Sequence, residues 1–201
     1  GADLSGEFWS YKQGSREEER VALAFPAVMP YQIRKPVLAA INGHAIGVGL
    51  TFSMTCDIRI VAEDAKIQFA FVRRGLTPEL SSHVIVPRIA GFSVAADLML
   101  SGRMISGREM ARLGLASEAL PAAEVLAAAL EKARDYKNTA PVSVALTRQM
   151  LWRLLGADHP MEAHKVDSRG IAERGKSADS REGVMSFLEK RTPVYPVKVS
   201  D

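Results

Sequence analysis

The segment from Lys35 to Thr51 constrains the fold more than any other part of the chain. A short apolar run at 37–41 predicts a buried strand, Asn42-Gly43 predicts a turn, and residues 49–54 predict a buried helix. The glycine spacing fits neither a P-loop nor a dinucleotide-binding turn. A strand that opens a helix through small residues lets the backbone approach a ligand, and its free N–H groups can hold an anion or a developing oxyanion. Tight strand–helix packing explains the same pattern equally well.

The rest of the chain changes from mixed to helical. A strand is expected at 57–62 and a helix at 16–33. Further helices are expected at 79–89, 92–100, 106–113, 121–136, 142–155, 161–175 and 178–190. With 47% hydrophobic residues the chain can bury a sizeable core. We therefore predict an α/β fold with a core at 1–120 and a helical region at 121–201.

Composition excludes several classes of function. The net charge of +3 is not gathered into a basic stripe, so no nucleic-acid partner is expected. Polar residues and glycines interrupt the longest uncharged stretch, so no membrane span is expected. The single cysteine, Cys56, cannot form an internal disulfide, which favours a reducing, cytoplasmic location. His159 and His164 lack metal-ligand spacing, and no metal site is expected.

Several motifs occur in the same order as in a known family. The segment Lys35-Pro-Val-Leu-Ala-Ala-Ile-Asn-Gly resembles the crotonase (enoyl-CoA hydratase/isomerase) superfamily. Further matches, in order, are Gly1-Ala2-Asp3, Cys56-Asp57, Gly75-Leu-Thr-Pro78, Ser101-Gly102-Arg103, Gly114-Leu115-Ala116 and Phe187-Leu-Glu-Lys-Arg191. Together they span the chain from end to end.

The resemblance implies a spiral core of ββα turns and a C-terminal helical region that drives trimerisation. The implied partner is an acyl-CoA thioester, with coenzyme A as part of the substrate and no separate cofactor. The implied assembly is a homotrimer or a dimer of trimers. The family's first strands would precede Gly1, so we expect the native protein to be longer and this chain to leave an exposed sheet edge.

The resemblance also assigns roles to individual residues. Carried over by position, the backbone N–H groups of Ala2 and Val48 form an oxyanion hole for the thioester oxygen. Phe187 and Lys190 resemble residues that reach a neighbouring subunit's coenzyme A, although a solvated lysine at a helix end is an equal explanation for Lys190. The substrate-binding positions implied are Gly47, Phe71, Leu76, Phe187 and Lys190.

The chain departs from the family at the catalytic carboxylates. The family's hydratases have one glutamate after the glycine turn and another before Gly-x-x-Pro, where this chain has Thr51 and Phe71. Thr51 can orient a water molecule but cannot act as a general base at neutral pH. Glu79, which follows Pro78, is the candidate substitute, with a pKa raised by apolar neighbours. An acidic residue that complements a helix dipole is the alternative explanation for Glu79.

Three functions remain open at this point. The first is an enzyme of the enoyl-CoA hydratase/isomerase type, for which a single carboxylate favours isomerisation, decarboxylation or thioester hydrolysis over two-base hydration. The second is an acyl-CoA-binding protein with little or no catalysis. The third is a serine hydrolase on a related spiral fold, which needs a Ser–His–Asp arrangement, and no serine in the expected turn supports it. Ser82 and His83 are adjacent, and adjacent helical residues point in different directions.

Overall fold

The computed structural model describes residues 28–199, which form two compact units. Residues 28–31 and Leu38–Ala129 belong to the first unit, and Gln32–Val37 and 130–199 belong to the second.

The first four strands of the first unit alternate between two sheets. The strands are β1 (Leu38–Ile41), β2 (Ala45–Ile46), β3 (Ile58–Ala62), β4 (Lys66–Gln68), β5 (Ile105–Ser106) and β6 (Glu118–Leu120). One sheet has the order β1-β3-β6, with all pairs parallel. The other has the order β2-β4-β5, in which β2 and β4 are parallel and β5 is antiparallel. The pairs β1–β2 and β3–β4 are therefore successive turns of a spiral, which confirms the predicted fold class.

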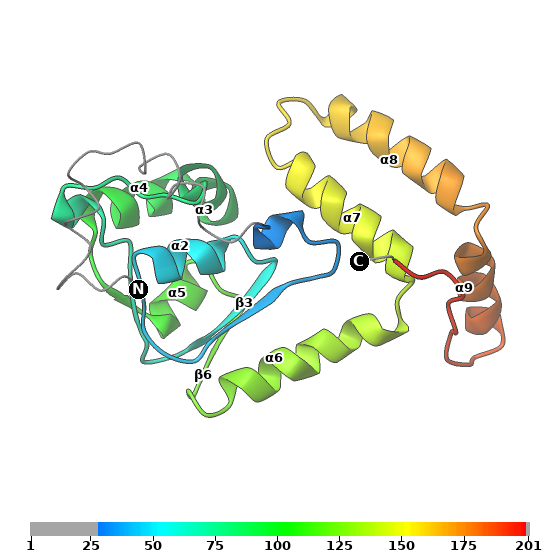
Figure 1. Cartoon of the computed structure of the whole chain (residues 1–201), viewed down its shortest axis with the longest axis horizontal. Coiled ribbons are helices and arrows are strands. Elements are labelled where there is room, and N and C mark those ends of the chain that lie inside the picture. The colour runs from blue at the N-terminus through cyan, green and yellow to red at the C-terminus, as the bar shows by residue number, and fades with distance from the viewer. Residues whose placement is uncertain (1–27, 200–201) are drawn as a thin grey trace. The chain divides into compact units, whose positions relative to one another are not determined.

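Helices fill the turns of this spiral. They are α2 (Val48–Met54), α3 (Ser82–Ala90), α4 (Phe92–Ser101) and α5 (Gly107–Arg112), with a short 3-10 helix, η3, at Val72–Arg74. Helix α3 packs against both α2 and α4, while α5 packs against β3 and β6 (Figure 1). The side chains at the centre are apolar and fully buried, among them Leu50, Met54, Ile60, Ile67, Phe69, Leu98, Met110 and Leu115.

Two sequence predictions for this unit need correction. Helix α3 begins at Ser82 and not at Glu79, because Leu80 and Ser81 have left-handed backbones that no α-helix contains. The short strands β2, β4, β5 and β6 were not predicted, since two or three residues do not establish an alternating pattern. Of the helix expected at 16–33, residues 16–27 lie outside the described residues, and Pro30–Gln32 form a 3-10 helix, η2.

A buried arginine connects two segments of the core. Arg59, on β3, donates from Nε to the carbonyl oxygen of Leu115 and from Nη1 to that of Cys56, both at 2.6 Å. Burial lowers the pKa of this guanidinium. The two hydrogen bonds give this buried guanidinium acceptors within the core.

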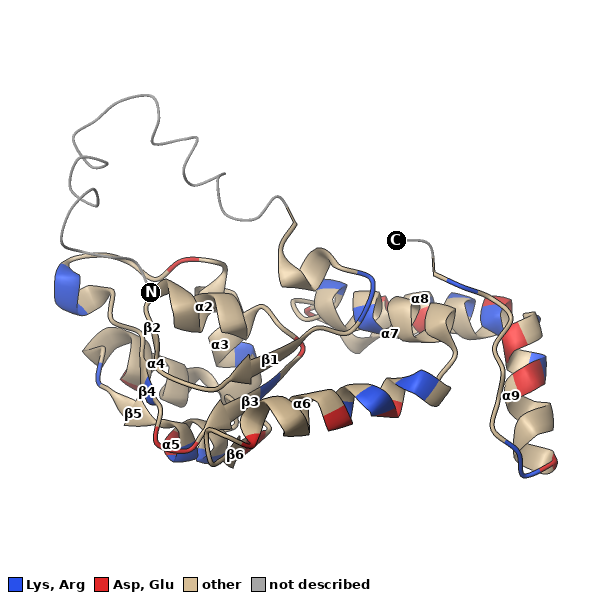
Figure 2. Cartoon of the chain, turned by 60° about the horizontal axis from the view of Figure 1, so that its bottom comes forward, with Lys and Arg blue, Asp and Glu red and all other residues tan. Residues whose placement is uncertain are grey.

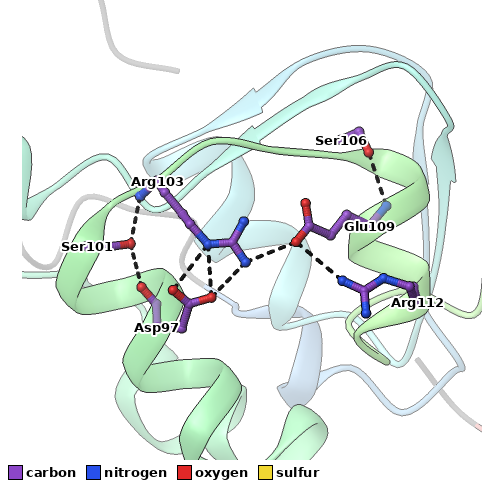
Figure 3. A network of polar contacts seen from close by, with 6 residues as sticks. All are labelled: Asp97, Ser101, Arg103, Ser106, Glu109 and Arg112. Carbon is purple, nitrogen blue, oxygen red and sulfur yellow. Dashed lines mark hydrogen bonds and ion pairs between the residues drawn. The ribbon is translucent and has the colours of Figure 1, made fainter.

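A polar network holds the connection between α4 and α5. Arg103 lies between two carboxylates and binds Asp97 at 2.7 Å and Glu109 at 3.0 Å (Figure 3). The hydrogen bond from Arg103 lowers the pKa of Asp97. Ser106 caps α5 by accepting from the N–H of Glu109 at 3.2 Å. The network fixes the short segment that contains β5.

The second unit is helical, as predicted. Helix α6 (Val125–Arg134) enters it from the first unit, and η4 (Asp135–Asn138), α7 (Pro141–Arg153), α8 (Pro160–Arg174) and α9 (Ala178–Leu188) follow. Helices α7 and α8 run side by side (Figure 1). Arg148 on α7 donates to the carbonyl oxygen of Ile33, which places the segment Gln32–Val37 with this unit.

The C-terminal segment returns along α9, a helix with neighbouring acidic and basic residues (Figure 2). The N–H of Val194 donates to Glu182 at 2.7 Å, and the N–H of Val197 donates to Asp179 at 3.2 Å. Glu182 also binds Arg191 at 2.6 Å. Two carboxylates of α9 thus anchor the backbone of residues 192–199.

Candidate active site

The glycine turn links β2 to α2 through one residue with an unusual backbone. Gly47 has φ 60° and ψ −125°, a conformation that residues with a side chain rarely adopt. Its N–H donates to the carbonyl oxygen of Gln68 on β4 at 3.0 Å, and its carbonyl oxygen accepts from Leu50 and Thr51. The turn is therefore fixed to both the neighbouring strand and the helix that follows.

The backbone N–H of Val48 is unoccupied in this turn. Across residues 28–199, no hydrogen bond from the Val48 N–H to a protein acceptor is found, while the N–H groups of Gly47, Leu50 and Thr51 all have acceptors. Such a donor at a rigid turn is suited to an oxygen that gains negative charge during a reaction. The second expected donor, Ala2, lies outside the described residues.

The two positions of the usual glutamates carry no carboxylate, and both side chains are buried. Thr51 donates its hydroxyl hydrogen to its own helix, at 3.2 Å from the carbonyl oxygen of Val48 and 3.4 Å from that of Gly47. Its lone pairs remain as acceptors. Phe71 contributes an apolar ring, and its carbonyl oxygen accepts from the N–H of Leu76 at 3.0 Å, so Phe71 and Leu76 are neighbours.

Glu79 supplies a carboxylate near the start of α3. Partial burial raises the pKa of Glu79 above its usual value of 4.5, which confirms the direction predicted from its apolar surroundings. A neighbouring charge is not the cause. The residue as a whole is exposed, so its carboxyl group is accessible while it is partly desolvated. A carboxyl group of this kind can both take up and return a proton.

Other candidate residues have simpler roles. His44 accepts a hydrogen bond at Nδ1 from the N–H of Lys66 at 3.1 Å, which links the glycine turn to β4. The hydroxyl of Ser82 is buried and has no partner among the described residues, so it forms no pair with His83. This observation weakens the serine-hydrolase hypothesis.

Phe187 and Lys190 belong to the second unit, whereas the glycine turn and Glu79 belong to the first. Phe187 lies on α9 with 81% of its surface exposed, and Lys190 follows the helix as an exposed residue with φ 53°. Both are accessible for contacts outside their own unit.

Within residues 28–199, no group of three or more His, Cys, Asp or Glu side chains is placed to hold a metal ion. Nor does any helix in this range have the length and apolar character needed to cross a bilayer.

No sequence pattern indicated the left-handed backbone at Leu80 and Ser81 or the Ser82 hydroxyl without a partner among the described residues. Neither leucine nor serine favours that conformation, so residue type carries no signal for it. The unusual backbone of Leu80 and Ser81 was therefore missed, although the neighbouring Glu79 carboxylate was identified.

The spiral of short strands and the glycine turn that opens α2 define the class of fold. The model of the enoyl-CoA hydratase/isomerase family matches residues 10–198. The chain therefore belongs to the enoyl-CoA hydratase/isomerase family, the crotonase superfamily of the sequence prediction.

Relatives with known sequences and structures agree with this assignment. The enoyl-CoA hydratase ACTT3 of Alternaria alternata is 41% identical over 197 residues, which are 97% of this chain and 66% of that protein. A crystal structure of enoyl-CoA hydratase from Bacillus anthracis matches with a TM-score of 0.87 and 29% identity, over 97% of this chain and 75% of that one. A crystal structure of a probable enoyl-CoA hydratase/isomerase from Mycobacterium abscessus matches with a TM-score of 0.81 and 37% identity, over 85% of this chain and 66% of that one.

Proposed function

We propose that this chain is part of an acyl-CoA enzyme that stabilises a thioester enolate, of the enoyl-CoA hydratase/isomerase type. The observation that carries the proposal is the unoccupied N–H of Val48 at the rigid glycine turn. Together with the N–H of Ala2, it would bind the thioester oxygen as that oxygen becomes negative. One such donor contributes about 3 to 4 kcal/mol to a transition state.

Glu79 would act as the acid–base residue. Its carboxylate removes a proton from the acyl chain, the C–H electron pair moves into the thioester, and the carbonyl oxygen becomes an enolate oxygen held by Val48. A raised pKa makes the carboxylate a stronger base for this removal, and the protonated Glu79 then returns the proton to carbon. Gly47, Phe71 and Leu76 would line the site around the acyl group.

A single carboxylate favours a proton shift within the acyl chain over hydration. Hydration needs one group to activate water and another to deliver a proton. Thr51 and Phe71 occupy the positions of the usual pair, and the Thr51 hydroxyl already donates to its own helix. Thr51 would at most accept a hydrogen bond from a water molecule. Isomerisation uses one carboxyl group for both transfers.

The absence of carboxylates at positions 51 and 71 also favours a second candidate, an acyl-CoA-binding protein with little or no catalysis. Such a protein keeps the oxyanion turn and binds the thioester without converting it. Binding without turnover distinguishes it from the enzyme.

We further propose a homotrimer or a dimer of trimers, assembled through the second unit. Helix α8 has no buried residue, Ile171 on it is 74% exposed, and Phe187 on α9 is 81% exposed. Apolar side chains exposed to this extent on a helical unit are typical of subunit contacts. In such an assembly Phe187 and Lys190 would contact the coenzyme A of a neighbouring subunit. Light scattering after gel filtration gives the number of subunits.

The test is turnover of a panel of enoyl-CoA thioesters by the full-length protein, followed by mass spectrometry for masses and by NMR for double-bond position. Wild type, Glu79→Gln and Asp64→Asn are compared, because Asp64 is an exposed carboxylate of the same unit with no proposed role. Turnover lost in Glu79→Gln alone, with thioester binding kept, supports the enzyme. Binding without turnover in the wild type supports the second candidate.

A further inference from the structure

The residues that follow Glu79 have a backbone that lowers the stability of the fold. Leu80 has φ 53° and Ser81 has φ 58°, so both are left-handed although each has a side chain. The Cβ atom of an L-residue makes this region unfavourable, and glycine adopts it without strain. Two such residues in succession store strain directly beside the proposed acid–base residue.

The start of α3 also lacks the serine cap found elsewhere in this chain. Ser106 and Ser177 precede α5 and α9 with extended backbones, and their hydroxyls accept from the N–H groups of Glu109 at 3.2 Å and Ser180 at 3.1 Å. Ser81 precedes α3 in the left-handed region and makes no side-chain cap bond. A cap therefore does not offset the strain at Ser81.

Side-chain packing does not explain the strain either. Ser81 is exposed and Leu80 is half-buried, so neither places a side chain in the core. The next residue, Ser82, is fully buried, but its hydroxyl has no hydrogen-bond partner in the described part of the chain. A buried polar group without a partner lowers stability further. Three adjacent residues thus share unfavourable features that the core does not require.

The turn does fix the backbone of Glu79. The N–H of Ser82 donates to the carbonyl oxygen of Glu79 at 3.1 Å, and the N–H groups of Val84 and Ile85 both donate to the carbonyl oxygen of Ser81 at 3.0 Å. The chain therefore reverses immediately after Glu79. None of the described residues donates a hydrogen bond to the Glu79 carboxylate, so the backbone of this turn sets the point from which the side chain extends.

We infer that Leu80 and Ser81 form a strained turn that positions the Glu79 carboxyl group for proton transfer. Both are positioning residues, because they act through Glu79 and not on the substrate. The inference rests on the proposed function of Glu79. It follows the general observation that backbone strain is retained at sites where it holds a reacting group in place.

Glycine at position 81 removes the strain, while alanine keeps the Cβ atom and removes only the hydroxyl. Ser81→Gly is expected to raise the melting temperature and to lower kcat by on the order of tenfold with KM unchanged, since a small displacement of a reacting group can reduce the rate by up to about a hundredfold. A more mobile carboxyl group is better hydrated, so the Glu79 pKa should fall towards its usual value, as read from the pH profile and from NMR titration of the carboxyl carbon. Ser81→Ala should keep the wild-type kcat and pKa.

A Ser81→Gly protein with a higher melting temperature but an unchanged kcat and Glu79 pKa would overturn the inference, and so would a lower melting temperature. Leu80→Gly is the second variant if Ser81→Gly does not fold. Turnover lost in Glu79→Gln but kept in both glycine variants would refute the positioning role alone. Turnover kept in Glu79→Gln would refute the proposed function, and the NMR titration would still show whether the turn places the carboxyl group.

Discussion

The N–H of Ser82, the first residue of α3, donates a hydrogen bond at 3.1 Å to the carbonyl oxygen of Glu79, the proposed acid–base residue. The side chain of Glu79, in contrast, makes no hydrogen bond to the described residues, and partial burial raises its pKa. The backbone is fixed while the carboxylate is destabilised, which is the arrangement expected of a group that exchanges protons.

This arrangement predicts a gain in stability when the charge is removed. A carboxyl group with a raised pKa stabilises the folded state fully below its unfolded pKa of about 4.5, and this contribution is lost as pH rises through the folded pKa. Glu79→Gln should therefore melt at a higher temperature than wild type at pH 7, and the difference should shrink as the pH falls towards 4.5. A variant less stable than wild type at pH 7 would show that the carboxylate is not destabilised by burial.

Two glycine-to-alanine changes should have opposite effects. A Cβ atom at Gly107 would lie 2.0 Å from the carbonyl oxygen of Ala62, so Gly107→Ala must displace backbone and should lower the free energy of unfolding by about 3 kcal/mol. Gly170 lies within α8 with no atom near its added Cβ, and Gly170→Ala should raise stability by about 0.5 to 1 kcal/mol. Urea denaturation measures both, and a neutral Gly107→Ala would contradict the close approach.

A buried ion pair holds the start of α9. Asp179 is 1% exposed and binds Arg174 at 3.0 Å. Asp179→Ala leaves this arginine without its partner and should lower the free energy of unfolding by about 3 kcal/mol. Glu131→Ala removes an exposed pair with Arg134 and should change it by less than about 1 kcal/mol. Equal effects of the two variants would refute the distinction by burial.

The C-terminal segment should loosen when its anchor is neutralised. Hydrogen bonds from Arg191 and from the N–H of Val194 lower the pKa of Glu182 to about 2. A lowered pKa contributes stability above the usual value of 4.5, and that contribution is lost as pH falls from there towards 2. Glu182→Gln should accelerate hydrogen exchange at Val194 at neutral pH. Glu189→Gln is the control, because Glu189 binds Arg191 but not the backbone of residues 192–199. In this variant, hydrogen exchange at Val194 should stay slow.

Helical periodicity carried much of the fold prediction, because α4 and α6 to α9 each have enough residues to show an apolar face. The strands β2, β4, β5 and β6 have two or three residues and are defined by their partners, which sequence patterns do not reveal. The first residue of α3 was misplaced for a related reason. The backbone of Leu80 and Ser81 contradicts their intrinsic preferences, and tertiary structure imposes it.

The residues of the candidate site also fall into those that the structure describes and those that depend on parts it does not contain. Val48 and Glu79 were identified from motif positions, and the structure adds an unoccupied N–H to the first and a raised pKa to the second. The roles of Phe187 and Lys190 depend on a neighbouring subunit, which a single chain does not contain. The assignment of Ala2 depends on residues outside the described range.

Enolate formation is tested most directly by hydrogen exchange at the substrate, which does not require the final reaction to be known. A saturated acyl-CoA is incubated with the full-length protein in D₂O, and deuterium at the carbon beside the thioester is measured by NMR. Deuterium incorporation is expected with wild type and with Asp64→Asn, and its loss is expected in Glu79→Gln with acyl-CoA binding unchanged. Exchange at the wild-type rate in Glu79→Gln, or no exchange by a wild-type protein that binds acyl-CoA, would contradict this expectation.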